Sequence, residues 1–312
     1  MMNPLNQHRP VLLNEVVEAL AIKQNGVYFD GTFGRGGHTT EILKHLSENG
    51  QILAMDQDPQ AIHTARKLFA NEQRFNIVQE NFADMEAFIS SHGMLQQIDG
   101  ILLDIGVSSP QLDDASRGFS FIKSGPLDMR MNPDVGQSAA EWLATVEEYD
   151  LTTVLMHFGE EKFARRIANA IVEMRKETVI NDTVQLANII EAAIPVKSKH
   201  KHPATKSFQA IRIYINRELE VLELALNTSL KMLTVGGRLA VISFHSLEDR
   251  MVKRFFRKMT RGPQIPKDIP LLAVDLEQPY KLVGKAIKPT KQEIQENPRS
   301  RSSVLRVIER VK

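Results

Sequence analysis

Three aspartates at the ends of apolar runs are the residues of this chain whose types and spacing point most directly to chemistry. Asp30, Asp56 and Asp104 each close a short apolar run that can fill a buried strand. The first of them opens the glycine-rich turn DGTFGRGGH (30–38), which leads into a helical pattern. Glycines allow positive φ and let the backbone approach a ligand closely. A glycine-rich turn between a strand and a helix N-terminus is typical of the nucleotide-binding corner of doubly wound α/β folds.

The acidic residue of this turn limits which nucleotide would fit. In a dinucleotide site the helix N-terminus receives a pyrophosphate, which the carboxylate of Asp30 would repel. The third glycine of a dinucleotide fingerprint would fall at Thr39 and is missing. Asp30 suits a ligand with an ammonium group instead. The pattern from Asp30 to Gly36 resembles motif I of S-adenosylmethionine-dependent methyltransferases, with Thr32 in place of the usual first glycine; the alternative is a tight turn without a ligand.

Two further residues fit an adenosine. Asp56 lies 20 residues after Gly36 at the end of a predicted strand, where a carboxylate can accept hydrogen bonds from both ribose hydroxyls. The alternative for Asp56 is a cap on the turn before Pro59. Phe82 follows the next predicted strand and is placed to lie against an adenine face, although an isolated aromatic residue is more often part of a core.

The loop after Asp104 is predicted to face the reacting group, because ligands of open α/β sheets bind beyond the carboxyl ends of the strands. Enzymes that methylate exocyclic amines often carry an Asp/Asn-Pro-Pro-aromatic motif there, which orients the amine hydrogens. This chain has Ser108, Ser109, Pro110 and Gln111 at the corresponding place. The roles of the individual residues in this loop therefore stay open.

Histidines offer a proton acceptor but no metal site. His245 follows the predicted strand at 237–243 and is the best-placed imidazole for proton transfer, with capping of the next helix as an equal alternative. His200 and His202 lie in a lysine-rich loop without a partner carboxylate, which indicates surface residues. No metal is implied, and the absence of cysteine excludes disulfides, thiol catalysis and Cys-ligated zinc.

The charge distribution indicates a polyanionic partner. Residues 1–195 carry 15 Lys and Arg against 27 Asp and Glu (−12), and residues 196–312 carry 24 against 11 (+13). A basic half of this size favours nucleic acid over the alternative of solvated surface charge. The residues predicted to face phosphates are Lys253, Arg254, Arg257, Lys258 and Arg261, interleaved with Phe255 and Phe256, together with Arg299, Arg301 and Arg306.

Composition predicts a globular protein, with the cytoplasm as the default location. Its hydrophobic content is 42% and its charged content 25%, as expected of a soluble protein with a sizeable core. No secretory signal is evident at the N-terminus, and no apolar segment approaches the ~20 residues of a membrane span.

Strand and helix patterns alternate through the first third of the chain and then stop. Strands are expected at 27–30, 51–56, 75–79 and 99–105, with helices at 12–20, 39–48, from Pro59 onwards and at 85–95. This alternation predicts a parallel, doubly wound sheet. Residues 106–136 read as loop, and 138–230 as helix only, with a basic break at 195–206. A strand at 237–243, a helix at 247–259 and two late strands near 280–287 and 303–311 complete the chain. We therefore expect one α/β domain, formed by 1–113 and 217–312, that is interrupted by an all-helical domain at 114–216.

Eight sequence blocks together carry a specific resemblance. They are HRPVLLNEV (8–16), FDGTFGRGGHT (29–39), DQDPQAI (56–62), DGILLDIGVSSPQLDDASRGFSF (99–121), GPLDMRM (125–131), HPATKSFQAIRI (202–213), GGRLAVISFHSLEDR (236–250) and NPRSRSSVLR (297–306). In these blocks the chain resembles the bacterial 16S rRNA (cytosine-N4)-methyltransferase family over nearly its whole length. The resemblance implies a class I S-adenosylmethionine-dependent methyltransferase domain with an inserted helical domain. It also implies methylation of N4 of a cytidine in the decoding region of small-subunit rRNA.

The resemblance also implies functional positions. The cofactor positions would be Gly36, Gly37, His38, Asp56, Phe82, Asp104 and Gln111. Asp104 and the loop with Ser108 and Ser109 would orient the amine, with His245 as a candidate for proton transfer. The partner would be small-subunit rRNA or the small ribosomal subunit, with the oligomeric state left open. The rival readings are a methyltransferase for DNA or small-molecule amines and a non-catalytic RNA-binding factor of the same fold.

Overall fold

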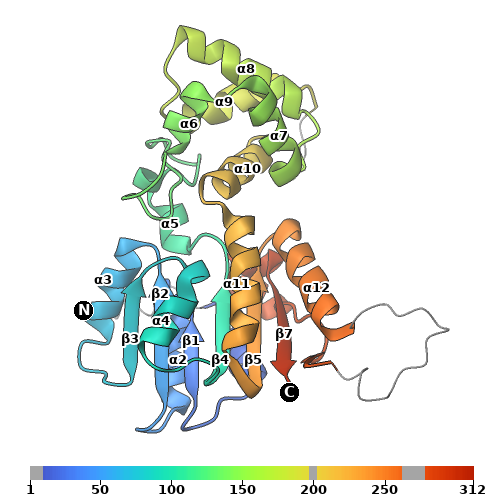
Figure 1. The fold of residues 1–312 in the computed structure, drawn as a ribbon. Helices are drawn as coiled ribbons and strands as arrows, with labels where there is room; N and C mark the ends of the chain where they lie inside the picture. The colour runs from blue at the N-terminus through green and yellow to red at the C-terminus, as the bar shows by residue number, and fades with distance from the viewer. Residues whose placement is uncertain (1–9, 197–201, 262–277) are drawn as a thin grey trace, which may run out of the picture. The chain divides into compact units, whose positions relative to one another are not determined.

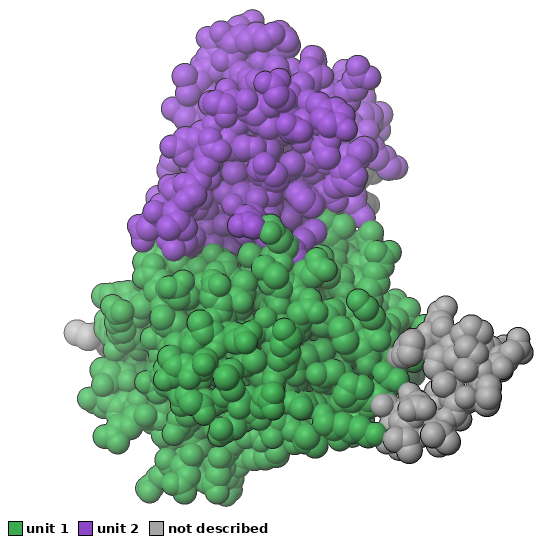
Figure 2. Space-filling model, viewed as in Figure 1, with its two compact units in different colours: residues 1–106, 220–312 green, residues 107–219 purple. Residues whose placement is uncertain are grey.

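The computed structural model describes residues 10–196, 202–261 and 278–312, and these form two compact units. Unit 1 comprises residues 1–106 and 220–312, and unit 2 comprises residues 107–219 (Figure 2). The chain thus passes from one unit to the other after Gly106 and again after Leu219. The sequence placed these two transitions after 113 and 216.

Unit 1 is built on a seven-stranded mixed sheet with the strand order β3-β2-β1-β4-β5-β7-β6 (Figure 1). The strands are β1 (Val27–Asp30), β2 (Gln51–Asp56), β3 (Phe75–Gln79), β4 (Ile98–Asp104), β5 (Leu233–Ser243), β6 (Tyr280–Leu282) and β7 (Val304–Arg310). The first five strands pair in parallel, and β7 is antiparallel to both β5 and β6. The prediction of a doubly wound, Rossmann-like α/β fold is confirmed.

Two strands differ clearly from their predicted bounds: β6 ends at Leu282 and not near 287, and β5 starts earlier than predicted. It begins at Leu233, although Val235-Gly236-Gly237 reads as a turn in the sequence. The register with β4 shifts between Ile98 and Gly100, which accommodates the extra residues as an irregularity inside the pair. A Cβ at Gly237 would lie 2.8 Å from the carbonyl oxygen of Ile98, so this close approach requires glycine. The glycines therefore mark a bend within a strand and not its start.

Helices enclose the sheet of unit 1 and bury both of its faces (Figure 1). They are α1 (Leu13–Leu20), α2 (Gly37–His45), α3 (Pro59–Leu68), α4 (Met85–Ser91), α12 (Ser246–Arg261) and α13 (Lys291–Glu296), with α11 (Glu218–Met232) crossing the boundary between the units. In β4, Leu102 packs in one hydrophobic cluster with Val16 and Ile42, whereas Ile101 and Leu103 pack in another that includes α4, α11 and α12. This two-sided burial explains the unbroken apolar run of β4.

The named elements of unit 2 are helices, and they enclose a separate hydrophobic core. The helices lying within it are α5 (Ser109–Asp113), α6 (Ala139–Thr145), α7 (Glu148–Gly159), α8 (Ala164–Glu177), α9 (Thr183–Ala193) and α10 (Thr205–Ile215). Fully buried residues such as Leu155, Ile167, Leu186 and Ile211 fill this core. Part of the predicted basic break, residues 197–201 with His200, lies outside the described residues. Among the helices that the structure describes, none has the length and apolar character to cross a membrane.

Candidate functional site

The glycine-rich turn lies at the carboxyl ends of three adjacent parallel strands. The N–H of Gly31 donates to the carbonyl of Leu102 in β4 (3.0 Å), and the N–H of Phe33 donates to the carbonyl of Met55 in β2 (3.1 Å). The turn that leaves β1 is therefore held by both neighbours of that strand. This fixes the position at which α2 begins.

Glycines 36 and 37 are required by the protein's own packing. Gly36 precedes α2 with a φ of 76°, a conformation that favours glycine. A Cβ at Gly36 would lie 2.6 Å from the ring of Phe33, and one at Gly37 would lie 2.1 Å from Pro10. Their closest neighbours are thus side chains of this chain, so the packing alone accounts for both glycines. Their predicted contact with a cofactor stays a prediction.

Asp30 is a structural residue of the turn. Its side chain is 1% exposed; Oδ1 accepts a hydrogen bond from the N–H of Thr32 (3.1 Å) and Oδ2 accepts one from the hydroxyl of Thr39 (2.7 Å). Burial raises the pKa of Asp30, and the hydrogen bond from Thr39 opposes this shift. Both oxygens accept hydrogen bonds that order the turn. The predicted contact of this carboxylate with a ligand's ammonium group stays a prediction.

Asp56 ties the end of β2 to the glycine-rich turn. Oδ2 accepts a hydrogen bond from the N–H of Gly34 (2.7 Å), and Oδ1 accepts one from the N–H of Asp58 (2.9 Å). Burial raises the pKa of Asp56 to about 6, and the two backbone hydrogen bonds act in the opposite direction. Its carboxylate therefore does cap the turn before Pro59, as the alternative reading held. Each oxygen keeps a second lone pair that can accept a further hydrogen bond. Capping of the turn is therefore compatible with the predicted hydrogen bonds from ribose hydroxyls.

His38 and Asp104 bring unpartnered polar atoms together at the end of β4. His38 is 7% exposed, and neither ring nitrogen has a hydrogen-bond partner among the described residues. Its Nε2 lies 3.7 Å from Oδ2 of Asp104, beyond hydrogen-bond distance. Oδ1 of Asp104 is likewise buried without a partner, whereas the N–H of Asp104 donates to the hydroxyl of Thr32 (2.7 Å). Buried polar atoms are almost always paired in folded proteins, so this cluster is suited to a polar ligand.

Phe82 stands beside the same corner. It opens a short 3₁₀ turn (Phe82–Asp84) directly after β3 and is half-buried against the hydrophobic cluster of β1, β2 and β4. A Cβ at Gly31 would lie 3.1 Å from the Cβ of Phe82, so the aromatic residue packs on the glycine-rich turn. This position is compatible with the predicted adenine contact, which stays a prediction.

His245 is engaged with the first turn of α12. The N–H of Glu248 donates to Nδ1 of His245 (3.4 Å), and Oε2 of Glu248 accepts from the N–H groups of Phe244 (2.9 Å) and His245 (3.2 Å). Nε2 of His245 lies 3.0 Å from Oε1 of Glu248, whose side chain is 2% exposed. This reciprocal arrangement is a capping box in which histidine replaces serine. The capping role predicted as the alternative is therefore present, and proton transfer by His245 stays a prediction.

The predicted residues of the following loop belong to unit 2. Ser108 and Gln111 form a capping box at the start of α5: the Ser108 hydroxyl accepts from the N–H of Gln111 (3.4 Å), and Oε1 of Gln111 accepts from the N–H of Ser108 (2.9 Å). Ser109 is the first residue of this helix and is 9% exposed. The three side chains thus shape a short helix, and their predicted roles in catalysis and cofactor binding stay predictions.

Comparison with known proteins establishes the family. A model of the MraW methylase family matches residues 5–311. The chain belongs to the MraW methylase family. A relative from Alteromonas mediterranea named "Ribosomal RNA small subunit methyltransferase H" is 57% identical over 307 residues, which are 98% of each chain. The protein of that name from Pseudoalteromonas atlantica is 56% identical over 97% of this chain and 98% of its own.

A solved structure of an rRNA methylase from Streptococcus thermophilus is also similar to this MraW-family chain. The superposition covers 96% of this chain and 94% of the chain in that structure, at 10% sequence identity and a TM-score of 0.39. That score is too low to transfer a site. The site in this MraW-family chain therefore rests on its own geometry.

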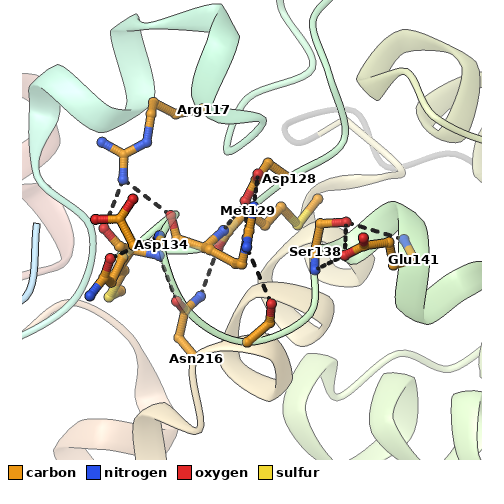
Figure 3. A network of polar contacts seen from close by, with 11 residues as sticks. Arg117, Asp128, Met129, Asp134, Ser138, Glu141 and Asn216 are labelled. Atoms are coloured by element: carbon orange, nitrogen blue, oxygen red, sulfur yellow. Dashed lines mark hydrogen bonds and ion pairs between the residues drawn. The ribbon is translucent and has the colours of Figure 1, made fainter.

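A polar network in unit 2 of this MraW-family chain was not anticipated from the sequence (Figure 3). Arg117, 7% exposed, donates from Nη2 to the carbonyls of Arg130 (3.1 Å) and Met131 (2.8 Å). Asn216 donates to the carbonyl of Met129 (2.8 Å) and accepts from the N–H of Met131 (2.7 Å). These contacts hold Met129 at a φ of 63°, in the left-handed region. The network fixes the path of the segment GPLDMRM (125–131).

Asp128 and Arg130 complete this network. Nε and Nη2 of Arg130 donate to the two oxygens of Asp128 at 2.9 and 2.8 Å. Burial alone would raise the pKa of Asp128, but the hydrogen bonds from Arg130 outweigh it and hold that pKa below its usual range. The sequence offered one signal for this pair, the i, i+2 spacing of opposite charges in LDMR, but none for Asn216, which lies 85 residues further along the chain than Met131.

His202 differs from its predicted environment. Its Nε2 lies 3.9 Å from Oε2 of Glu191, and its ring packs on Phe121 with centroids 4.6 Å apart. The prediction that it has no carboxylate nearby is therefore wrong, although its side chain is 41% exposed, as expected of a surface residue.

Proposed function

We propose that this protein transfers a methyl group from S-adenosylmethionine to N4 of a cytidine in the decoding region of 16S rRNA. The observation that carries the proposal is the similarity, over 98% of the chain at 57% identity, to a relative named for methylation of small-subunit rRNA. Membership of a methylase family supports the reaction class. The choice of N4 and of the decoding region is what the resemblance to the bacterial 16S rRNA (cytosine-N4)-methyltransferase family implies, a resemblance that the blocks GVSSPQLD and SFHSLEDR carry most specifically.

The residues of unit 1 fit the cofactor. Within residues 10–196, 202–261 and 278–312, the buried nitrogens of His38 and Oδ1 of Asp104 have no hydrogen-bond partner, which leaves donors and acceptors for a polar ligand beside the glycine-rich turn. Asp56 has lone pairs left for ribose hydroxyls, and Phe82 offers an aromatic face. Gly36, Gly37 and His38 would contribute the start of α2. When bound, S-adenosylmethionine supplies an electrophilic methyl group on a sulfonium, whose positive charge suits the carboxylate of Asp104.

In this reaction the main task of the protein would be to orient the cytosine amino group. The lone pair of a cytosine amino group is delocalised into the ring, so the amine must be held in one geometry before it can attack. Asp104 stands at the end of β4 with one oxygen available to accept an amine hydrogen. Its backbone is fixed by the hydroxyl of Thr32, so the acceptor is preorganised. Ser108 and Ser109 at the start of α5 are the further candidates for this task, and His245 is the candidate for accepting the proton.

In this proposal the substrate is ribosomal RNA or the small ribosomal subunit. The reaction would take place in the cytoplasm. Unit 2, inserted between β4 and β5, would recognise the substrate. Enzymes that modify a base act on single-stranded or extruded nucleotides, which the decoding region would have to present. The basic half of the sequence supports such a polyanionic partner.

Methyl transfer in vitro followed by mass spectrometry tests this function. The purified protein is incubated with isotopically labelled S-adenosylmethionine and either small subunits or naked 16S rRNA from cells that lack the protein. Nuclease fragments are then mapped for the label. We expect one labelled N4-methylcytidine in a decoding-region fragment. A label on another base or on DNA would support the rival amine methyltransferase, and cofactor binding without any turnover would support a non-catalytic RNA-binding protein.

A further inference from the structure

One face of α12 carries a stripe of basic side chains. Arg250, Arg254, Arg257 and Arg261 follow one another at intervals of four, three and four residues, and all four are exposed. At 100° per residue these positions fall within an arc of about 60° on the helix surface, and they span roughly 16 Å along its axis. Lys258 is also exposed and borders the same arc. We call these five residues the α12 stripe.

The opposite face of α12 fixes the direction of the stripe. Val252 and Phe256 are each 1% exposed and belong to the core cluster of unit 1. Because this face is buried, the stripe must point to solvent. The burial of Phe256 also corrects the prediction that this ring lies among phosphate-facing residues, since it cannot reach a ligand. Arg306, predicted for the same role, pairs with Asp249 at 2.7 Å and is held at the sheet.

Stabilisation of helix α12 itself does not explain the α12 stripe. Arg250 and Arg254, Arg254 and Lys258, and Arg257 and Arg261 are like-charged pairs at i, i+4, and such pairs disfavour a helix. The helix dipole favours cations only in the last turn, which does not account for Arg254. The two acidic residues of α12 lie ahead of the stripe: Glu248 is buried and Asp249 is paired with Arg306. The stripe is thus a purely cationic surface that its own helix does not require.

We infer that the α12 stripe binds the phosphate backbone of the RNA substrate; this inference rests on the proposed function for the identity of that polyanion. Closely spaced guanidinium groups suit phosphates because each can donate two parallel hydrogen bonds. Phosphate contacts fix the register of a protein on nucleic acid but carry no sequence information. The stripe therefore anchors the RNA and leaves the choice of base to the site at the end of β4.

The test is the salt dependence of RNA binding in two matched triple variants. The stripe variant is Arg254→Gln, Arg257→Gln and Arg261→Gln. The control variant is Arg66→Gln, Lys67→Gln and Lys231→Gln, which removes the same charge from exposed positions on α3 and α11. The probe is transcribed 16S rRNA. In the stripe variant we expect the log–log slope of affinity against salt to fall by about 2, since each lost phosphate contact removes roughly 0.7–0.9. The control should keep the wild-type slope.

Kinetics and folding controls complete the experiment. The stripe variant should show a raised KM for RNA with an unchanged Kd for S-adenosylmethionine and an unchanged rate at saturating RNA. Circular dichroism should show retained helix, because the substitutions remove like-charge pairs. Equal slope losses in both variants would mean that net charge alone matters, and an unchanged slope in the stripe variant would mean that the stripe does not contact RNA. Either result overturns the inference. If the slope falls only in the stripe variant while no rRNA is methylated, the inference stands and the proposed function fails.

Discussion

The end of β4 in unit 1 and the segment 125–131 in unit 2 are both polar and largely buried, but their polar atoms are satisfied to different degrees. In unit 2, Arg117 and Asn216 donate to backbone carbonyls, and the Asp128 carboxylate receives two hydrogen bonds from Arg130 (Figure 3). In unit 1, the ring nitrogens of His38 and one oxygen of Asp104 have no partner among the described residues.

This difference separates a structural network from a candidate binding site. A satisfied buried network stabilises one conformation, and removing any member leaves the others unpaired. Unpartnered buried atoms lower the stability of the free protein and are retained where a ligand pairs with them. We therefore expect mutations in the unit 2 network to change stability, and mutations around His38 and Asp104 to change ligand binding and rate.

The largest expected effect is on the rate. Asp104→Asn keeps the shape of the side chain but removes the negative charge that the proposed function places beside the sulfonium and the amine. Single-turnover methylation at saturating cofactor should fall about 100-fold, the size typical for a lost preorganised electrostatic contact. RNA affinity should change little. If saturating S-adenosylmethionine restores the full rate, Asp104 only binds cofactor, and the orienting residue must be sought at Ser108, Ser109 or His245.

The next effect is on stability and belongs to unit 2. Arg117→Met keeps the length of the side chain but removes the donors to two backbone carbonyls. The free energy of unfolding should fall by about 3 kcal/mol, since a hydrogen bond from a charged donor contributes roughly 1.5–3 kcal/mol. Denaturant titration measures this change, and Kd for S-adenosylmethionine should remain that of the wild type. Lys176→Met is the control: its exposed pair with Glu173 should contribute under about 0.5 kcal/mol. Equal losses in the two variants would contradict a structural network around Arg117.

The pH dependence of cofactor binding probes Asp56. Burial raises its pKa to about 6, so below pH 6 the free protein increasingly holds a protonated Asp56. A neutral carboxyl is a weaker acceptor for ribose hydroxyls, so affinity for S-adenosylmethionine should fall about tenfold between pH 8 and pH 5. Calorimetry should give a flat, weaker profile for Asp56→Asn. A parallel pH profile in both proteins would show that another group titrates.

The raised pKa of Asp56 also makes the free energy of unfolding depend on pH. The pKa of Asp56 is higher in the folded protein than its ordinary value of 3.8, so the folded state binds more protons between pH 4 and 6. Its contribution to the free energy of unfolding is therefore fully present below about pH 4 and is lost as the pH rises through 6.

The smallest expected effect concerns Thr32, the residue that replaces the usual glycine of the turn. Its hydroxyl accepts the hydrogen bond from the N–H of Asp104. Thr32→Val removes this acceptor without changing the shape of the side chain, and should weaken S-adenosylmethionine binding about fivefold, or roughly 1 kcal/mol. Thr32→Ser keeps the hydroxyl and should behave as the wild type. If both variants bind equally well, Thr32 does not position the end of β4.

The parallel sheet was predictable because local patterns determine it. β1, β2 and β3 have the predicted bounds, since each is a short apolar run followed by a turn signal. Strand β5 was predicted four residues too short, because a paired strand can absorb the bend at Gly236 and Gly237 through a register shift that its own sequence does not show.

The places of the candidate site residues at strand ends were predictable, but the contacts that each residue makes were less so. Asp56 and Asp104 stand at strand ends as expected, but only the structure shows that both oxygens of Asp30 accept hydrogen bonds within the turn and that His245 caps α12. Such roles depend on which donors reach each oxygen. The contact between Asn216 and the segment around Met131 joins residues far apart in the chain, so no local pattern could reveal it.

The most direct test of the account is the stability of His38→Leu with and without S-adenosylmethionine. Leucine removes two buried nitrogens that have no hydrogen-bond partner in the described part of the chain. Without cofactor, the variant should be at least as stable to denaturant as the wild type, because an unsatisfied polar group has been replaced by an apolar one. With saturating cofactor, the wild type should gain clearly more stability than the variant. A variant that is less stable without cofactor, and gains as much as the wild type with it, would contradict the claim that His38 and Asp104 form the ligand site.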